Sequence, residues 1–219
     1  MEMKTDYYYL DFLKFLDKID FKNKNVLDIG CGSGDTTSEL VKRGAKVSAC
    51  DIIDGRKPGN KNSFSFNITK KDNLSFPDNS FDIVINFDVL EHVEDDLTFV
   101  NEMYRVLKPG GTAYVFTPNL FRIGRWLRTL ATGKFPEFPM LLGKDELLGD
   151  CIHLREYTKR SIETLFSKSG FSKAQVKGFW LGLYHPVTVK YRIAQPPHFI
   201  SFLSQTLVAK AEKPTVVVQ

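Results

Sequence analysis

The 219-residue sequence lacks several features that mark whole classes of protein. No apolar run approaches the roughly 18 residues that a membrane-spanning helix needs, so no transmembrane segment is expected. The first 20 residues alternate charged with apolar side chains, which argues against a secretory signal. The 3 cysteines, Cys31, Cys50 and Cys151, are far apart, and they predict neither a disulfide framework nor a zinc site. We therefore expect a cytoplasmic protein.

Neither sign of charge dominates the sequence, which has 30 basic and 26 acidic residues and a net charge of +4. Nucleic-acid-binding proteins usually carry a dense basic stripe, and so small an excess predicts no nucleic-acid partner. Hydrophobic residues, in contrast, make up 42% of the sequence and aromatic residues 13%, which is enough to bury a complete core. Length and composition together predict one folded domain over residues 1–219.

Short apolar runs alternate with segments of helical spacing over the first 118 residues. We expect strands at 26–29, 46–51, 63–67, 81–87 and 112–117, and helices at 6–19, 35–43 and 95–107. A break rich in glycine and proline covers 119–156, and a helix at 158–169 and strands at 174–180 and 201–211 follow it. This alternation predicts an α/β fold with a doubly wound, Rossmann-like and mostly parallel sheet, covered by helices on both faces.

Three glycines at alternate positions, Gly30, Gly32 and Gly34, separate the first expected strand from the helix that follows. Glycine permits a positive φ and lets a ligand approach the backbone, and the free N–H groups at the start of a helix attract polar or anionic atoms. The spacing fits neither the dinucleotide-binding fingerprint nor a P-loop. A tight turn without a ligand is the alternative, but the carboxyl end of a strand in such a sheet favours a binding site.

Two acidic residues flank this loop. Asp28 lies two residues before Gly30, where a carboxylate can stabilise a cationic ligand or hold the loop in place. Asp51 closes the second expected strand, 17 positions beyond Gly34, and can accept hydrogen bonds from both hydroxyls of a ribose. A role in a turn or a helix cap is the alternative for Asp51.

Together these motifs resemble the class I S-adenosylmethionine-dependent methyltransferases, and in particular the subgroup that methylates small molecules. The resemblance rests on VLDIGCGSGDTT, Asp51, LSFPDNSFDIVINFDVLEHVEDD and YRVLKPGGTAYVFTPN, and it resumes with HLREYTKRSIETLFSKSGF at 153–171. It implies S-adenosylmethionine as the cofactor, S-adenosylhomocysteine as the product, and an antiparallel strand at the C-terminal end of the sheet.

The resemblance also implies cofactor-binding residues at the ends of the first four strands. Asp51 would bind the ribose hydroxyls, and Asn86 would line the methyl-bearing sulfonium. Asn67 stands where relatives often carry an acid for the adenine amino group, and its side-chain oxygen can accept from that group without charge. The cofactor site expected in this way consists of Asp28, Gly30, Cys31, Gly32, Gly34, Asp51, Ile52, Asn67, Ile68, Asn86 and Phe87.

Two histidines are candidates for the catalytic group. His92 follows the fourth expected strand, close to where the methyl group would lie, and His153 comes four positions before Tyr157. A positioned histidine that removes a proton from a hydroxyl acceptor contributes about 10²- to 10⁴-fold to the rate. We assign His92, His153 and Tyr157 to catalysis, with a structural hydrogen-bonding role as the alternative. No metal is expected, because no His, Asp or Glu group has the spacing of metal ligands along the sequence.

The segment 119–135 contains four basic residues and no acid. Arg122, Arg125 and Arg128 recur every three residues while leucine and isoleucine occupy the other side, which predicts an amphipathic helix with a basic face. We expect 119–156 to be a lid, or substrate-side insertion, in which Arg122 and Arg125 bind an anionic acceptor. Peripheral contact with a membrane that holds an amphiphilic acceptor fits the same face. A basic face that is merely solvated, over a packed apolar face, is the alternative.

The sequence therefore predicts a methyltransferase that acts on a small or medium-sized acceptor, which the arginines favour as anionic. A non-catalytic, S-adenosylmethionine-binding regulatory module would need the same cofactor residues and remains the alternative. An RNA or protein methyltransferase has no support, because the fourth strand ends in Asn86-Phe87-Asp88-Val89 and not in an Asn-Pro-Pro-Tyr-type motif. The sequence leaves the methylated atom and the oligomeric state open.

Overall fold

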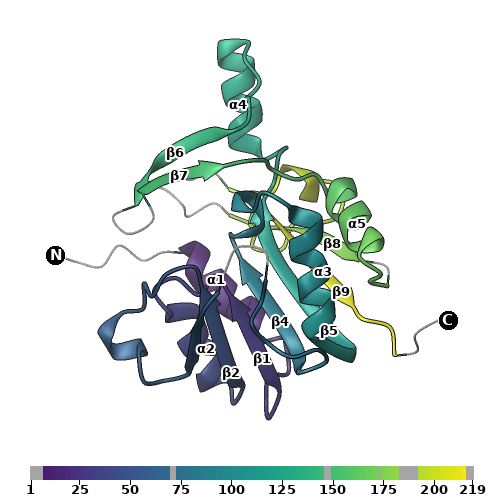
Figure 1. Ribbon diagram of the computed structural model, residues 1–219. Coiled ribbons are helices and arrows are strands. Elements are labelled where there is room, and N and C mark those ends of the chain that lie inside the picture. Colours follow the sequence, from purple (N-terminus) through teal and green to yellow (C-terminus); the bar gives the residue numbers. More distant parts are fainter. Residues whose placement is uncertain (1–6, 70–72, 146–148, 173, 183–191, 216–219) are drawn as a thin grey trace.

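A computed structural model describes residues 7–69, 73–145, 149–172, 174–182 and 192–215 (Figure 1). Five α-helices are assigned there: α1 (Tyr7–Leu16), α2 (Asp35–Lys42), α3 (Asp96–Val106), α4 (Ile123–Thr132) and α5 (Lys159–Lys168). Nine strands accompany them: β1 (Asn25–Ile29), β2 (Lys46–Asp51), β3 (Ser65–Ile68), β4 (Phe81–Phe87), β5 (Leu107–Pro118), β6 (Met140–Asp145), β7 (Gly149–His153), β8 (Gln175–Phe179) and β9 (Thr206–Glu212). Among these described residues no helix combines the length and the hydropathy that crossing a bilayer requires.

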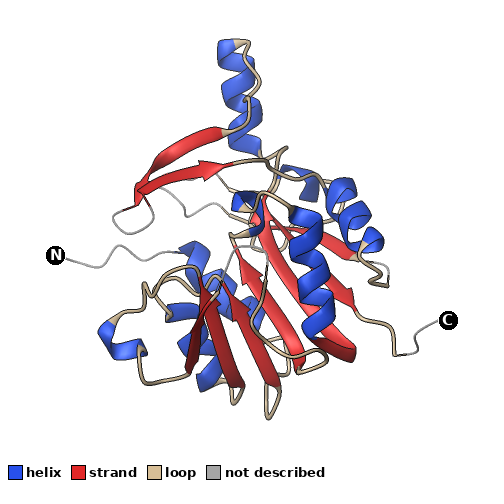
Figure 2. Ribbon diagram, viewed as in Figure 1, coloured by secondary structure: helices blue, strands red, loops and turns tan. Residues whose placement is uncertain are grey.

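Seven strands form one sheet in the order β3-β2-β1-β4-β5-β9-β8 (Figure 2). The strands from β3 to β5 are parallel, whereas β9 runs antiparallel to both β5 and β8. Parallel neighbours need crossover connections, which α2 supplies between β1 and β2 and α3 between β4 and β5. The predicted doubly wound, mostly parallel sheet with an antiparallel C-terminal strand is confirmed.

Alternate residues of each central strand enter two separate hydrophobic layers. In β1, Val26 packs in the layer that contains Leu16 of α1 and Leu40 of α2, whereas Leu27 packs in the layer of Val100 of α3. Because side chains of a strand point alternately to the two faces, a sheet that is buried on both sides needs apolar residues at most positions. This explains why β1 and β4 are largely apolar on both faces, although Asp28 interrupts β1, and Asp82 and Asn86 interrupt β4.

Two strands begin five residues away from their expected starts, whereas the other expected strands differ by two residues or fewer. β5 begins at Leu107, five residues early, because Leu107 already pairs with Phe81 before an irregularity in the register around the Pro109-Gly110-Gly111 turn. β9 begins only at Thr206, because the first part of the expected strand forms a short 3-10 turn over Ser201–Leu203. The expected bounds of β2 and β4 are confirmed residue for residue.

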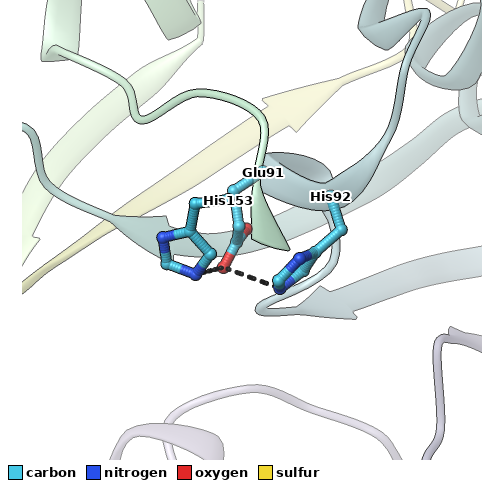
Figure 3. Close-up of side chains that lie close together, drawn as sticks. All are labelled: Glu91, His92 and His153. Atoms are coloured by element: carbon cyan, nitrogen blue, oxygen red, sulfur yellow. Dashed lines mark ion pairs between the residues drawn. The ribbon is translucent and has the colours of Figure 1, made fainter. Parts of the chain in front are cut away.

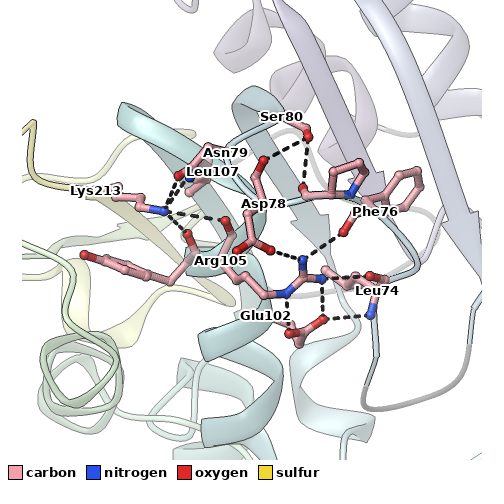
Figure 4. Close-up of polar contacts among 11 residues, drawn as sticks. Leu74, Phe76, Asp78, Asn79, Ser80, Glu102, Arg105, Leu107 and Lys213 are labelled. Atoms are coloured by element: carbon pink, nitrogen blue, oxygen red, sulfur yellow. Dashed lines mark hydrogen bonds and ion pairs between the residues drawn. The ribbon is translucent and has the colours of Figure 1, made fainter.

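Two cations tie the C-terminal end of the chain and a surface loop to α3 (Figure 4). Lys213 donates from Nζ to the carbonyl oxygens of Tyr104 and Leu107 at 2.9 and 2.8 Å, and thereby satisfies acceptors at the end of the helix. Arg105 donates to the carbonyl oxygens of Leu74 and Phe76, both at 2.8 Å. The core under α3 is closed by these contacts far from the carboxyl-terminal edge of the sheet.

The segment that breaks the alternation folds into α4 and a separate two-stranded sheet, in which β6 and β7 are antiparallel. Figure 1 shows this hairpin above the carboxyl-terminal edge of the large sheet, with α4 projecting away from it. The chain returns to the body at Asn119 and Tyr157, which form an isolated bridge. An insertion on the side of the sheet where ligands bind is therefore anchored at both of its ends.

Candidate functional site

The three glycines after β1 all have a positive φ, but they are needed for different reasons. A Cβ on Gly30 would overlap the side chain of Val89, and one on Gly34 would lie 2.9 Å from Cζ of Phe64. These two glycines are therefore required by packing within the chain. Gly32, with φ +50°, has nothing within 4 Å of its Cβ position. Open space above a glycine in a strand-to-helix loop is what close approach of a ligand to the backbone needs.

Asp51 at the end of β2 lies beside this open space. Its carboxylate accepts from the backbone N–H groups of Gly32 at 2.8 Å and Ile52 at 2.7 Å. Register pairs Asp51 with Ile68 of β3, and the side chains of Ile52 and Ile68 are exposed although both are large and apolar. An acid next to exposed apolar surface is suited to a nucleoside, whose ribose is polar and whose base has apolar faces. Asn67 is exposed on the same strand.

Burial raises the pKa of two side chains in and beside the glycine loop. Asp28 is buried, and burial raises its pKa from 3.8 to about 6, helped by the charge of Asp51 and opposed by a hydrogen bond from the Thr37 hydroxyl. Burial, with the nearby charges of Asp28 and Asp51, also raises the pKa of the Cys31 thiol to about 12. Cys31 therefore remains a neutral thiol and contributes through its backbone, whereas Asp28 is a carboxylate that would gain from a cationic neighbour.

Asn86 and Phe87, which end β4, have different surroundings. Asn86 is fully buried and donates from Nδ2 to the carbonyl of Ile29 at 3.1 Å, while its Oδ1 has no hydrogen-bond donor among the described residues. Phe87 packs against Phe12 and Phe116, with ring centroids 4.6 and 5.2 Å apart. Asn86 thus offers a polar atom beside the glycine loop, and Phe87 serves mainly to hold α1 on the sheet.

On the other side of the glycine loop, Glu91, His92 and His153 lie together (Figure 3). Glu91 and His92 belong to a 3-10 turn after β4, and His153 ends β7. The backbone N–H of Leu154 donates to the carbonyl of Glu91 at 2.9 Å and so joins the two segments. Nε2 of His153 lies 3.8 Å from Oε1 of Glu91, and Nε2 of His92 lies 4.0 Å from the same oxygen.

Hydrogen bonds orient both imidazole rings. Nδ1 of His92 lies 2.7 Å from the carbonyl of Ile152, which can only accept, so Nδ1 carries the proton. Nδ1 of His153 lies 3.0 Å from Oε1 of Glu156. Burial lowers the pKa of His92, which keeps the ring neutral. With their Nδ1 protons committed, neutral rings have their free lone pairs on Nε2, and both Nε2 atoms face Glu91.

Glu156 holds the base of α4. Its fully buried carboxylate pairs with Arg122 and Arg125, each at 2.8 Å. Burial opposes ionisation of Glu156, but the hydrogen bond with His153 and the two arginines together hold its pKa below the ordinary value. Glu156 was not predicted as a site residue, because it lies outside the acid-free segment 119–135 that contains the arginines.

This ion pair sets the orientation of α4. Arg125 is only 7% exposed and faces the body of the protein, whereas Leu130 is 77% and Leu127 48% exposed. Trp126 is also exposed. The alternative of a solvated basic face over a packed apolar face is therefore wrong at these positions, because pairing with Glu156 draws Arg125 inward. Arg128 is exposed on this helix, as predicted.

Tyr157 follows His153 by four positions, but its side chain has different hydrogen-bond partners. Its ring is buried, and its hydroxyl donates to Oδ2 of Asp96 at 2.9 Å. Burial and the charge of Asp96 raise the pKa of the phenol far above its usual range. The position does not support the catalytic role predicted for Tyr157, and it joins β7 to the start of α3 instead.

The expectation that no metal-ligand group exists was based on spacing along the sequence, and it missed Glu91, His92 and His153. His153 lies 61 positions after His92, and the three residues meet only because β7 returns to the end of β4. Glu91 had one local signal, its place beside His92 after a buried strand. Of the four histidines, His185 lies outside the described residues.

A family model described as "Methyltransferase domain" matches residues 1–176 of the chain. Norajmaline N-methyltransferase of Rauvolfia serpentina is 32% identical over 118 residues, which are 49% of this chain and 40% of that protein. A ubiquinone biosynthesis O-methyltransferase of Bartonella tribocorum is 36% identical over 106 residues, which are 45% of this chain and 43% of that protein. The chain thus spans less than half the length of these two curated relatives.

Solved structures show the same fold at low identity. The crystal structure of an S-adenosylmethionine-dependent methyltransferase from Mesorhizobium loti matches with a TM-score of 0.64 at 16% identity, over 96% of this chain and 100% of that one. A Burkholderia thailandensis 1,6-didemethyltoxoflavin-N1-methyltransferase with bound S-adenosylhomocysteine matches with a TM-score of 0.56 at 17% identity, over 97% of this chain and 79% of that one. With the match of the family model, these findings show that the chain belongs to the class I S-adenosylmethionine-dependent methyltransferases.

Proposed function

We propose that this chain transfers a methyl group from S-adenosylmethionine to a polar atom of a small-molecule acceptor. One observation carries the proposal. β1 and β4 are neighbours with Ile29 in register with Asn86, and Gly30 packs directly against Val89. The glycine loop and the turn that carries His92 are therefore adjacent, so a donor site and a pair of imidazoles would meet at one edge of the sheet.

The residues of this chain fit the cofactor. Gly32 leaves room for it over the loop, Asp51 offers carboxylate oxygens for its ribose, and Oδ1 of Asn86 is a buried polar atom in need of a partner. Asp28, whose ionised form burial disfavours, would gain from the charge of an amino group nearby. When bound, S-adenosylmethionine supplies an electrophilic methyl group on a positively charged sulfur. Asn67, Ile52 and Ile68 would border its adenine.

On the acceptor side, the chain has to orient a nucleophile and remove a proton. In transfer to a hydroxyl, the new oxygen–carbon bond forms as the carbon–sulfur bond breaks, the sulfur keeps the electron pair, and the hydroxyl proton must leave. The neutral His92 presents its Nε2 lone pair, and His153 lies beside it with a ring-centroid distance of 4.9 Å. Orientation of two reactants contributes up to roughly 7–11 kcal/mol, and a general base adds about 10²- to 10⁴-fold.

The acceptor that fits this edge is amphiphilic, with an anionic group and an apolar part. Arg122 is the more accessible partner of Glu156, at 21% side-chain exposure against 6% for Arg125, so Arg122 is the arginine with room for an acceptor anion. The exposed apolar side of α4 could lie along the apolar part of the acceptor, or against the membrane surface in which it resides. The insertion 119–156 would then act as the lid of the site.

Radiolabelled cofactor tests this function. The protein is incubated with methyl-labelled S-adenosylmethionine and extracts fractionated by charge and polarity, and the label is followed into small molecules. We expect label in acidic, amphiphilic fractions. Tight binding of S-adenosylhomocysteine without transfer to any fraction would favour the non-catalytic regulatory module instead.

A matched pair of variants assigns the acceptor side. His92→Gln should lower turnover by 10²-fold or more while affinity for S-adenosylhomocysteine stays unchanged, because His92 lies outside the cofactor cradle. His198→Gln, a change at a histidine outside the cluster, is the control and should leave both quantities at the parent value. Equal turnover of the two variants would contradict the assignment of His92.

A further inference from the structure

We propose that Glu91, His92 and His153 form a binding site for a divalent transition-metal ion. Each residue offers one donor atom, Oε1 of Glu91 and Nε2 of the two histidines, and the three atoms lie within 4.8 Å of one another (Figure 3). Donors around one such ion lie about 3 Å apart, given metal–ligand bonds of about 2.0–2.2 Å. Small side-chain rotations would close the three atoms around an ion.

The second polar side-chain atom of each candidate ligand, the one that would not bind the ion, already makes a hydrogen bond. The Thr117 hydroxyl donates to Oε2 of Glu91 at 2.9 Å, and Nδ1 of His92 is bonded to the carbonyl of Ile152. Nδ1 of His153 is bonded to the Glu156 carboxylate. Metal-binding histidines almost always donate their other N–H to a carbonyl or carboxylate, which fixes the tautomer and the direction of the lone pair. The same arrangement is present here for both rings.

The carboxylate of Glu91 supplies an independent observation that favours a cation at this place. The residue is fully buried, and its Oε1 accepts no hydrogen bond within the described part of the chain. A buried carboxylate oxygen without a donor is unfavourable by about 1–3 kcal/mol or more, and native structures seldom retain one. With Nδ1 of each ring bonded elsewhere, the neutral form of each imidazole turns an Nε2 lone pair toward this oxygen and donates no hydrogen bond to it. A cation between them satisfies all three atoms at once.

The donor set limits the identity of the ion. Two imidazoles and one carboxylate suit zinc, manganese, iron or cobalt, whereas magnesium and calcium prefer oxygen ligands throughout. His92 is only half-buried, so ligand positions on the outer side of the ion stay open to an acceptor. Methyl transfer involves no change of oxidation state, and the ion would therefore bind an acceptor oxygen and lower the pKa of its hydroxyl.

This role in the reaction rests on the proposed function, but the site itself does not. A histidine that donates its Nε2 lone pair to an ion cannot accept a proton with the same lone pair. With the ion bound, the hydroxyl proton would go to water, and His92 would hold the ion in place of acting as the base. The two roles of His92 can therefore be separated by adding or removing the metal.

Metal binding can be measured directly on the 219-residue chain after dialysis against a chelator. We expect one Mn²⁺ per chain by electron paramagnetic resonance and one Zn²⁺ by calorimetry, with much weaker binding of Mg²⁺. Glu91→Gln preserves the shape of the side chain and should weaken Mn²⁺ binding by at least about 100-fold, more than the effect typical of an outer hydrogen-bond partner. His153→Gln should behave in the same way, and His198→Gln should bind as the parent does.

Affinity for S-adenosylhomocysteine shows whether each variant is folded. Protein that binds S-adenosylhomocysteine but neither Mn²⁺ nor Zn²⁺ would overturn the metal site and leave the proposed methyl transfer intact. Unchanged Mn²⁺ binding in Glu91→Gln would overturn it as well. Mn²⁺ binding that depends on Glu91 and His153, in a protein without methyl transfer, would support the site and refute the proposed function. Once an acceptor is known, turnover that is lost with chelator and restored by Mn²⁺ would support both.

Discussion

The proposed cofactor side, around Gly32 and Asp51, and the proposed acceptor side, around His92 and His153, are built by different interactions. On the cofactor side, Gly32 and Asp51 are joined by a hydrogen bond between a backbone N–H and the carboxylate that ends the next strand. On the acceptor side, His92 and His153 are 61 residues apart, and buried Glu156 holds His153 together with two arginines at the start of α4. One side depends on backbone geometry near β1, and the other on side-chain charges brought together over a long range.

Because of this difference, substitutions on the two sides should affect different properties of the protein. Changes on the cofactor side should affect ligand affinity while the fold survives, because the open space over Gly32 is not used by the chain itself. Changes on the acceptor side should first affect stability, because Glu156 is fully buried among cations. Measurements of ligand affinity and of the free energy of unfolding, made on variants of both sides, test this difference.

The largest effect is expected from Glu156→Ala. The substitution leaves the buried Arg125 without its carboxylate, and loss of one partner of a buried ion pair lowers the free energy of unfolding by about 3–5 kcal/mol. Glu163→Ala removes an exposed carboxylate that lies 3.9 Å from Lys159, and should change the free energy by at most about 1 kcal/mol. Denaturant titration measures both. Equal small losses would show that the acceptor side does not depend on Glu156.

Gly32→Val should abolish cofactor binding in a folded protein. The new side chain would occupy the space over the loop and strain a backbone with φ +50°, so we expect at least 1000-fold weaker binding of S-adenosylhomocysteine, or about 4 kcal/mol. Gly143→Val, at a strand position of β6 that also has nothing within 4 Å, is the matched control and should bind normally. Calorimetry measures the affinity of both variants. Normal binding by Gly32→Val would show that the ligand does not lie over Gly32.

Asp28 should make the stability of the ligand-free protein depend on pH. Its pKa is raised to about 6 in the folded protein from 3.8, so the folded state binds this proton more tightly than the unfolded state. The stabilisation is complete below about pH 4 and is lost as the pH rises through about 6. Asp28→Asn should therefore be more stable than the parent at pH 8, by about 3 kcal/mol, with little difference near pH 4.

Urea titrations between pH 4 and pH 8 would test this dependence, with Asp20→Asn as a control at an exposed acid. The parent and the control should lose stability together across this range relative to Asp28→Asn. Parallel profiles for all three proteins would show that Asp28 titrates as an ordinary carboxylate.

Asp51→Ala should weaken binding of S-adenosylhomocysteine by about 1.5–3 kcal/mol, the usual contribution of a hydrogen bond to a charged group. Asp54→Ala, nearby in sequence and paired with Arg56 at 2.8 Å, should bind as tightly as the parent. Calorimetry at one salt concentration compares them. An unchanged affinity in a folded Asp51 variant would remove the ribose assignment.

The smallest effect is expected from Leu130→Ser on α4. Because Leu130 is 77% exposed, its loss should change the free energy of unfolding by less than about 0.5 kcal/mol. A packed leucine, as expected when α4 is taken to bury its apolar side, would instead lose about 2–5 kcal/mol on truncation. Leu40→Ser in the core of α2 provides that contrast. A large loss at Leu130 would show that the apolar side of α4 is covered in solution.

The cofactor side could be predicted from the sequence to a large extent because its signals are local. The apolar run of β1, the alternate glycines and the acid that ends β2 follow one another within 26 residues, and each has a backbone consequence that does not depend on distant contacts. Even there, the sequence did not distinguish Gly32, which faces open space, from Gly30 and Gly34, which pack against Val89 and Phe64. That distinction depends on which side chains come to cover each glycine.

The acceptor side could be predicted only in part. Periodicity correctly placed an amphipathic helix near 123–132, but periodicity identifies two faces and not which of them turns inward. The tertiary structure decided the orientation, because a buried carboxylate 31 residues beyond Arg125 attracts the basic face more strongly than water does. The same long-range return brought His153 to Glu91 and His92, since strand order and not sequence spacing determines which side chains meet at the edge of a sheet.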